Sequence, residues 1–317
     1  MSALVSILIP CFNAERWIAQ CIESALDQNW PTKEVVVVDD GSTDGSAEVV
    51  ATFGDRVRFV RAEHQGGNAT RNQLLRLAHG EWLQYLDADD YLLPGKVAGQ
   101  MGAVAKSKHT VEVVYSPVIA LDMNDGSEHE IAIQDEDIDV TFFRWGPLNT
   151  GGLLMRRDAV EKVGGWKEDQ LCCQEHELLF RLRSAGTGFL LYNRAETVYR
   201  QHGTATVSKR DPLRTIHTRV ELTDRMEEYL SAMDRLTPTH REALFASRME
   251  CARSAYRVDP GFAARLSRKA ERAGRAWIYG SPALPLSYQI AVRFAGFGVT
   301  ERLAAWARRQ QTGEGLA

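Results

Sequence analysis

Few cysteines occur in the sequence, and none of them forms a recognisable metal or disulfide pattern. There are five among 317 residues, an odd number, with no Cys-x-x-Cys pair and no zinc-site spacing. A secreted chain stapled by disulfides would carry an even, regularly spaced set. We therefore expect a reduced, cytoplasmic protein. The cysteines are Cys11, Cys21, Cys172, Cys173 and Cys251.

Long apolar runs are also missing. No stretch reaches the roughly 18 consecutive apolar residues that a membrane-spanning helix needs. The N-terminal "MSALVSILIPCFN" is apolar, but it has no basic beginning and no small-residue cleavage site, and Pro10 interrupts it. We predict that it is a first strand and not a signal peptide.

The chain lacks a basic body of the kind that binds nucleic acid. Its net charge is −4, but residues 207–317 hold 19 Lys and Arg against 12 Asp and Glu, a net charge of +7, which leaves −11 for residues 1–206. An acidic body argues against a nucleic-acid partner. The basic tail fits either a solvated helical face or an anionic surface, such as the inner face of a membrane.

No Gly-x-Gly-x-x-Gly follows the first strand, so a dinucleotide reader is not expected. "LVSILIP" and "EVVVVDD" are short Val- and Ile-rich runs, typical of strands buried in a parallel sheet. Apolar residues at helical intervals lie between them, which predicts a helix. Strands and helices alternate in this way to about residue 90, which predicts a doubly wound sheet. Residues 95–205 are mixed, and an acidic edge or loop is expected at "GSEHEIAIQDEDID". Helices are expected at 213–234, 238–257, 260–278 and 287–310.

Aspartates gather where the predicted strands end. In an extended backbone, residues two apart point to the same side, so Asp87 and Asp89 of Asp87-Ala88-Asp89 can share one divalent ion. Mg²⁺ and Mn²⁺ favour oxygen ligands and leave positions open for phosphate oxygens. A solvated turn would explain the same residues without a metal. Asp39 and Asp40 end another predicted strand.

Three segments together resemble family 2 of the inverting glycosyltransferases, which have the GT-A fold. They are "VSILIPCFNAERWIAQCIESALDQNWPTKEVVVVDDGSTDGS", "GGNATRNQLLRLAHGEWLQYLDADD" and "CQEHELLFRLRSAG", and the resemblance covers about residues 4–205. It implies an α/β fold with a mostly parallel, Rossmann-like central sheet flanked by helices, followed by a helical C-terminal extension. The implied parts are a nucleotide-sugar half (1–94), an acceptor half (95–206) and the extension (207–317).

The resemblance implies donor-binding roles at the matching positions. Pro10 and Phe12 would flank the nucleotide base, and Asp40 or its neighbour Asp39 would accept hydrogen bonds from it. Arg71 would face the diphosphate, unless it is a surface arginine, and Asn72 would hold a loop. In Asp87-Ala88-Asp89, the first acid would bind the ribose and the second the metal, Mn²⁺ or Mg²⁺. Asp90 should be structural, because its side chain points away from the other two.

The acceptor side follows from the same resemblance. Aligning Leu178 and Arg181 with the family's helix makes Glu175 the general base. The family more commonly has a Glu-Asp pair here, and Gln174 replaces the first acid of that pair. Glu177 is then expected on the surface. His202 would reach the metal, with a structural histidine as the alternative. Gly151, Gly152 and Trp166 would line the acceptor site, where an aromatic ring can stack on a sugar, with a core position as the alternative for Trp166.

The expected function is metal-dependent transfer of a sugar to a saccharide, lipid-linked or other hydroxyl acceptor in glycoconjugate synthesis. The expected donor is a UDP-sugar, because UDP-sugars are the commonest donors in the family that the chain resembles. A catalytically degenerate nucleotide-sugar binder is the alternative that Gln174 keeps open. A nucleotidyltransferase is disfavoured, because "IPCFNAERW" lacks its glycine-rich, basic loop. The C-terminal helices, with apolar residues between arginines, predict either peripheral membrane contact or packing on the body or on a second subunit.

Overall fold

The computed structural model describes residues 2–202, 211–274 and 283–311. The chain forms two compact units. The first comprises Met1–Asp135 and Pro147–Val207, and the second comprises Glu136–Gly146 and Ser208–Ala317. A short internal segment thus belongs to the helical unit, which the sequence patterns did not indicate.

A seven-stranded sheet in the order β10-β6-β9-β4-β1-β2-β3 forms the centre of the first unit. Strand β1 pairs in parallel with both β2 and β4, and β2 pairs in parallel with β3, while β9 runs antiparallel between β4 and β6. The predicted mostly parallel sheet is therefore confirmed. The strands are β1 (Val5–Cys11), β2 (Lys33–Asp40), β3 (Arg58–Ala62), β4 (Trp82–Tyr85), β6 (Val113–Tyr115), β9 (Leu154–Arg156) and β10 (Phe189–Leu191).

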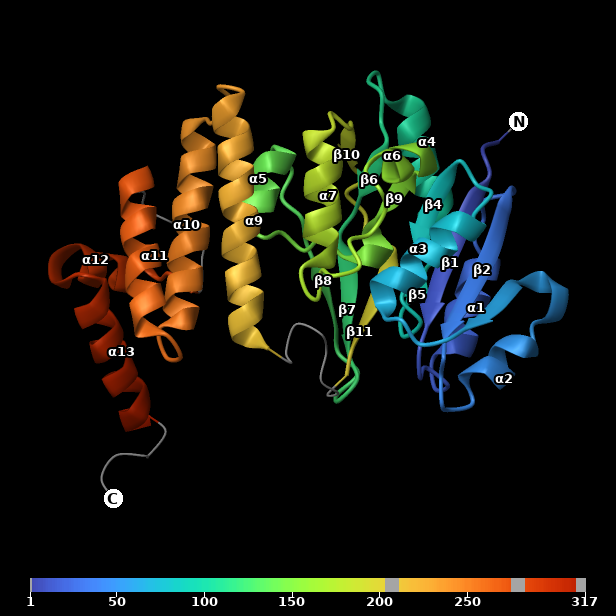
Figure 1. Cartoon of the computed structure of the whole chain (residues 1–317), viewed down its shortest axis with the longest axis horizontal. Coiled ribbons are helices and arrows are strands. Elements are labelled where there is room, and N and C mark those ends of the chain that lie inside the picture. Colours follow the sequence, from blue (N-terminus) through green and yellow to red (C-terminus); the bar gives the residue numbers. More distant parts are fainter. Residues whose placement is uncertain (1, 203–210, 275–282, 312–317) are drawn as a thin grey trace. The chain divides into compact units, whose positions relative to one another are not determined.

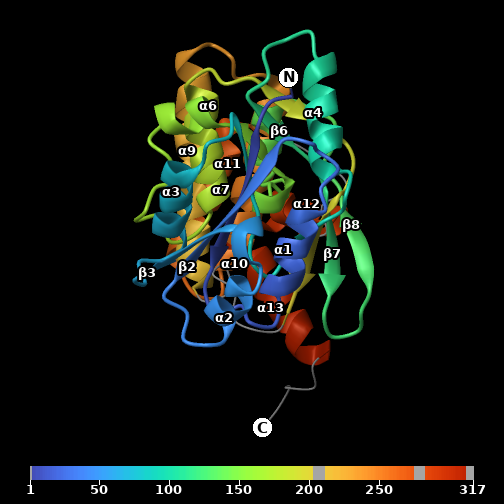
Figure 2. The same cartoon turned by 90° about the vertical axis from the view of Figure 1, so that its right-hand side faces the viewer.

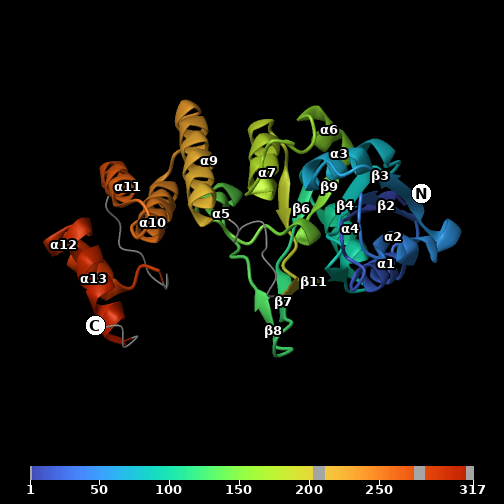
Figure 3. The same ribbon diagram turned by 60° about the horizontal axis from the view of Figure 1, so that its bottom comes forward.

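Helices cover both faces of this sheet, which is why its central strands are apolar on both sides. Figures 2 and 3 show α1, α2 and α4 on one face and α3, α6 and α7 on the other. Residues Ile7 and Ile9 of β1 belong to the core cluster that includes Ile18 and Ile22 of α1. The helices are α1 (Ile18–Leu26), α2 (Ser46–Ala51), α3 (Gly67–Leu77), α4 (Lys96–Lys106), α6 (Arg157–Lys162) and α7 (Gln174–Ser184), with a 3₁₀ turn η1 at Gly54–Arg56.

A second sheet of four strands, in the order β5-β11-β7-β8, lies in the same unit (Figure 3). Its edge strand β8 (Glu128–Ile131) lies in the acidic stretch for which an edge or a loop was expected. The other strands are β5 (Tyr91–Leu92), β7 (Val118–Asp122) and β11 (Thr197–Gln201), and a 3₁₀ turn η2 spans Thr150–Gly152. Strand β11 brings residues near position 200 alongside β5, directly after the Asp87–Asp90 turn.

The second unit is helical, as predicted (Figure 1). It contains α5 (Ile138–Phe143), α9 (Pro212–Ala232), α10 (Pro238–Ala255), α11 (Pro260–Ala273), α12 (Leu286–Ala295) and α13 (Phe297–Gln311). The single helix expected over 287–310 is wrong: Gly296, with φ of +79°, ends α12 in a left-handed conformation that favours glycine. The end of the helix expected at 260–278 lies outside the described residues.

The last two helices carry several apolar side chains on their surface. Phe294 is 89% exposed, and Ile290, Leu303 and Trp306 are exposed as well. The neighbouring Val292 and Phe297 are buried in the core of the unit. None of the helices in the described part of the chain is long and apolar enough to cross a membrane.

Candidate active site

The ends of parallel strands bring the predicted donor-binding residues to one edge of the large sheet. Because β1 and β2 are parallel with Cys11 opposite Asp39, the segment around Pro10 and Phe12 lies beside the acidic end of β2. The ring of Phe12 is 47% exposed and stacks on His64, with ring centroids 4.4 Å apart. An exposed aromatic face at a strand end is suited to stacking on a planar ligand.

The two aspartates that end β2 have different surroundings. Asp40 accepts hydrogen bonds from the backbone N–H groups of Gln65 and Gly66, at 2.8 and 2.9 Å, and lies 2.9 Å from Nδ1 of His64. Its carboxylate is thus committed to the loop before α3. Asp39 is fully buried, and its Oδ2 has no hydrogen bond among the described residues, although Arg61 lies 3.5 Å away.

Arg71 joins α3, the acidic turn and α7. Its Nη2 donates to Asp87 Oδ1 at 2.7 Å, and its Nη1 donates to Gln174 Oε1 at 3.3 Å. The side chain is buried, which excludes the surface arginine considered from the sequence. Burial raises the pKa of Asp87; Arg71 opposes this shift, while Asp89 and Glu175 add to it.

Asp89 lies in the same turn but remains accessible. Its Oδ2 is 2.8 Å from Nε2 of His202, and its side chain is 36% exposed. The ring of His202 is stacked beside Trp17, with centroids 6.2 Å apart. The structure therefore brings together the two residues that the resemblance assigned to a metal, although they are 113 positions apart in the chain.

Asp90 turns away from this pair, as expected of a structural carboxylate. It is buried, and it accepts a hydrogen bond of 2.9 Å from the backbone N–H of Arg200. The Arg200 guanidinium in turn donates to the backbone oxygen of Asp89 and lies over the rings of Trp17 and Tyr91. Arg200 thereby fixes the turn that carries Asp89. No local pattern indicates this contact, because it links segments that are far apart along the chain.

Glu175 is the second residue of α7, which begins directly after Cys173, and the φ of +56° places Cys173 in the left-handed region. Thr150 Oγ1 donates a hydrogen bond of 2.6 Å to Glu175 Oε1. Thr150 is buried in the η2 turn, and no sequence pattern indicated its role, because its contact with Glu175 joins segments 25 residues apart. A fixed hydroxyl therefore holds the carboxylate of the expected base.

Buried polar side chains donate hydrogen bonds to the backbone of the η2 turn and of the residue that follows it. Its backbone oxygens accept hydrogen bonds from Gln84 and Thr197 at Gly151, from Gln100 and Ser116 at Gly152, and from Lys96 at Leu153. These hydrogen bonds to the backbone fix the turn that carries Thr150.

The two glycines of this turn are buried, which corrects the expectation that Gly151 and Gly152 line an open acceptor site. A Cβ atom at Gly151 would lie 2.6 Å from Thr197 Cγ2, and one at Gly152 would lie 2.7 Å from the Ser116 backbone oxygen. Both positions are therefore glycine because protein atoms pack against them.

The structure selects the core alternative for Trp166, and the surface position expected for Glu177 is wrong. Trp166 is 2% exposed and packs edge-on against Tyr85, with Arg71 over its ring, so it is a core residue and has no free face for a sugar. Glu177 is buried and not on the surface, because it pairs with Arg181 at 2.7 Å, and Arg181 also donates to the Val163 backbone oxygen. In contrast, the loop-holding role of Asn72 is confirmed by its hydrogen bonds with the backbone of Trp166.

Carboxylates from these separate segments all affect the ionisation of one residue, Tyr199 on β11. Burial raises the pKa of the Tyr199 hydroxyl, and the carboxylates of Asp90, Asp89, Asp87 and Glu175 raise it further. So many carboxylates in one place repel one another unless cations or donor groups compensate. Arg71 and His202 are compensating partners at two of them, Asp87 and Asp89.

Comparison with known proteins agrees with this geometry. The family model described as glycosyl transferase family 2 matches residues 6–164. An uncharacterized glycosyltransferase of Rickettsia typhi is 25% identical over 234 residues, which are 72% of this chain and 70% of the relative. A related glycosyltransferase of Rickettsia felis is 28% identical over 187 residues, but these span only 31% of that longer relative.

Two solved structures are similar in fold. One is TarS 1–349 of S. aureus in complex with UDP-GlcNAc, with a TM-score of 0.59, 14% identity, and coverage of 96% of this chain and 92% of that one. The other is the mannosyltransferase PcManGT of Pyrobaculum calidifontis in complex with GDP-Man and Mn²⁺, with a TM-score of 0.52, 19% identity, and coverage of 96% and 86%. The fold is therefore GT-A, as predicted.

Proposed function

The chain belongs to glycosyl transferase family 2, and from this premise we propose that it moves a sugar from a nucleoside-diphosphate sugar to a hydroxyl acceptor with inversion at the anomeric carbon. The observation that carries the proposal is the convergence of the Asp87–Asp89 turn and Glu175, linked by Arg71. A donor-side acid pair and a separate carboxylate base are the two parts that such a reaction needs.

The donor would bind along the edge of the large sheet. The exposed ring of Phe12 would stack on the base, with Pro10 beside it. Asp39 has a carboxylate oxygen, Oδ2, that is available as an acceptor, whereas both oxygens of Asp40 already accept hydrogen bonds from the loop before α3. Asp87, held in place by Arg71, would accept hydrogen bonds from the ribose hydroxyls, and the small Ala88 lies between it and Asp89. The charge of Arg71 favours an anionic diphosphate nearby.

Asp89 and His202 fit a divalent cation. One carboxylate oxygen and one imidazole nitrogen, 2.8 Å apart and partly exposed, would supply two ligands and leave positions for diphosphate oxygens. When bound, Mn²⁺ or Mg²⁺ would neutralise the charge that grows on the leaving diphosphate. Arg200 holds the backbone of Asp89, so that the carboxylate stays aimed at this position.

Glu175 would act as the general base in a single displacement. Its carboxylate takes the proton of the acceptor hydroxyl, the hydroxyl oxygen bonds to the anomeric carbon, and the bond from that carbon to the diphosphate breaks. The electron pair of the broken bond leaves with the diphosphate, and the configuration at the carbon inverts. Thr150 would orient the carboxylate through its hydrogen bond, which makes it a positioning residue.

We propose that the donor is a UDP-sugar, since UDP is the commonest donor nucleotide in the family. The proposed acceptor is a saccharide, a lipid-linked molecule or another hydroxyl compound of glycoconjugate synthesis. The solved relatives bind UDP-GlcNAc and GDP-Man, so both belong in the first panel. Thermal shift with Mn²⁺ and a panel of nucleotide-sugars tests this, because a bound donor stabilises the folded protein as its concentration exceeds Kd. No stabilisation by any of them would contradict the proposal.

A catalytically degenerate binder is the alternative that the sequence left open. Gln174 replaces the first acid of the family pair, but its Oε1 accepts from Arg71 and its Nε2 donates to the Gln170 backbone oxygen, so it serves as a structural link. Glu175 keeps its carboxylate and its hydroxyl partner. Release of nucleoside diphosphate from the stabilising donor in the presence of Mn²⁺ separates the two functions, because a binder would release none.

The basic C-terminal helices are predicted to contact either a membrane surface or a second subunit. The exposed Phe294, Leu303 and Trp306 suit an anionic membrane that holds a lipid-linked acceptor, or a second subunit. A cytoplasmic enzyme that binds the inner face of a membrane would associate with vesicles of anionic phospholipid at low salt and dissociate at high salt. Absence of flotation with such vesicles would remove the membrane partner, and mass measurement in solution would then test for the dimer.

A further inference from the structure

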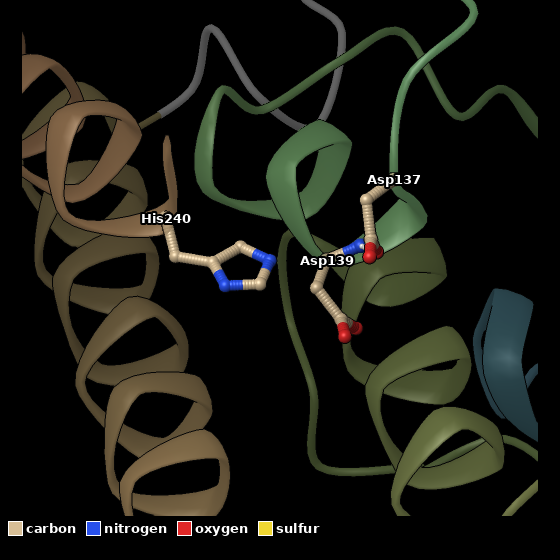
Figure 4. A group of neighbouring side chains, drawn as sticks. All are labelled: Asp137, Asp139 and His240. Atoms are coloured by element: carbon tan, nitrogen blue, oxygen red, sulfur yellow. Dashed lines mark hydrogen bonds between the residues drawn. The ribbon is translucent and has the colours of Figure 1, made fainter. Parts of the chain in front are cut away.

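A second group of metal-ligating side chains lies in the helical unit, among residues that the proposed transfer reaction does not use. Asp137, Asp139 and His240 offer one ligand atom each, and these atoms lie within 4.8 Å of one another. Figure 4 shows the His240 ring pointing from α10 toward both aspartates at the start of α5. All three residues belong to the second unit, so their proximity is a property of that unit alone.

The histidine itself points to a missing ligand. His240 is 3% exposed, and its Nε2 has no hydrogen-bond partner among the described residues. A buried polar atom without a partner costs free energy, roughly 1–3 kcal/mol, unless something satisfies it. Its Nδ1 lies 3.1 Å from both the backbone nitrogen of Thr237 and the backbone oxygen of Arg235. A proton on Nδ1, donated to the Arg235 oxygen, leaves Nε2 unprotonated and able to bind a metal.

The two carboxylates complete a site of mixed nitrogen and oxygen ligands. Asp137 is exposed and caps α5, accepting the backbone N–H of Asp139 at 2.8 Å with one oxygen. Asp139 is fully buried, with Arg235 3.5 Å from its Oδ2. A carboxylate has enough acceptor sites for both an ion-pair partner and a metal ion.

We propose that Asp137, Asp139 and His240 bind a zinc ion that fastens the α5 segment to α10. Imidazole and carboxylate ligands suit Zn²⁺, and three protein ligands leave the fourth tetrahedral position to water. Bonds of about 2.0 Å in a tetrahedron separate the ligand atoms by roughly 3.3 Å, so side chains whose ligand atoms lie within 4.8 Å of one another close by at most about 1.5 Å when the ion binds. The exposed Asp137 side chain has the freedom to make that movement.

The experiment must keep this site apart from the one at Asp89 and His202. The full chain carrying Asp89→Ala and His202→Ala is therefore freed of metal with a chelator and titrated with Zn²⁺ alone. We expect one bound equivalent by elemental analysis, a higher Tm with zinc, and a visible absorption band when Co²⁺ replaces zinc. No bound zinc in this background would overturn the proposal.

Two variants in the same background assign the ligands. Asp137→Asn keeps an N-cap of equal quality, so the fold should survive while zinc affinity falls at least about tenfold. His240→Gln should abolish the Co²⁺ band. Asp135→Asn, an equally exposed change of charge two residues away, is the matched control and should bind zinc as before. If Asp137→Asn binds zinc unchanged, or lowers the Tm equally with and without zinc, the cluster is only an ion-pair network and the proposal fails.

Discussion

The guanidinium of Arg71 donates to the carboxylate of Asp87 across 2.7 Å, and through its other nitrogen it reaches Gln174, the residue before Glu175. One buried side chain thus connects the donor side of the site with the helix that carries the proposed base. Because burial raises the pKa of Asp87 and Arg71 lowers it, this contact helps to keep the carboxylate ionised.

Replacing Arg71 by Met should weaken donor binding in a pH-dependent way. Without the guanidinium the pKa of Asp87 rises further, so the carboxylate protonates at a higher pH and loses acceptor sites for the ribose. We expect the Kd of the stabilising nucleotide-sugar to increase by about tenfold, the scale of one lost charged hydrogen bond, and to increase more at pH 6 than at pH 8. Calorimetric titration across this range measures it. An equal loss at every pH would contradict the proposed role of Asp87.

Asp89→Asn should remove metal-dependent turnover while leaving the fold intact. The amide keeps the size of the side chain but loses the charge that binds a hard cation. Release of nucleoside diphosphate should fall by at least about a hundredfold, a loss of roughly 2.7 kcal/mol. The matched control is Asp122→Asn, a change of charge on β7 outside this turn. Full turnover by the Asp89 variant would exclude Asp89 as the metal ligand.

Thr150→Val tests the positioning of Glu175. Valine preserves the shape of the side chain but cannot donate, so the base loses its oriented hydrogen bond, and kcat should fall by about tenfold with an unchanged donor Kd. Thr150→Ser should restore most of the rate. The exposed Thr110→Val serves as the control. A loss of donor affinity instead of rate, or no rescue by serine, would show that Thr150 is merely structural.

Lys96→Met should stabilise the protein at pH 7. Lys96 is fully buried, and burial lowers its pKa well below 10.5, with Glu196 opposing the shift only in part. Because burial lowers the pKa of Lys96 in the folded chain, the unfolded chain binds this proton more tightly, so folding becomes easier as the pH rises toward 10.5. The gain in Tm from the substitution should therefore shrink as the pH approaches 10. The exposed Lys106→Met should show no such trend.

The sequence predicted the large sheet and the acidic strand ends because both depend on local pattern. The Val-rich runs of β1 and β2 require burial on both faces, and parallel pairing then brings Asp39 and the Asp87 turn to one edge. The helices of the second unit followed from helical spacing and from Thr237-Pro238 at the start of α10, where the Thr237 side chain accepts a hydrogen bond from the backbone N–H of His240.

Contacts between distant segments could not be read in the same way. Glu177 looked like a surface residue because its partner and its burial depend on the loop at Val163–Gly165. The way in which strands far apart in the sequence come together likewise determines the contacts of Thr150 and Arg200 and the burial of Trp166. Glycines at 151 and 152 suggested open space, whereas the packing of Thr197 and Ser116 explains them.

The most direct test of the proposed mechanism is the Glu175→Gln variant, measured for two quantities with the donor that stabilises the wild-type chain. The account predicts that the donor Kd with Mn²⁺ changes by less than about twofold, while release of nucleoside diphosphate falls by roughly a hundredfold or more, as expected when a general base is lost. Turnover close to that of the wild type would contradict the assignment of Glu175, and so would a loss carried entirely by weaker donor binding.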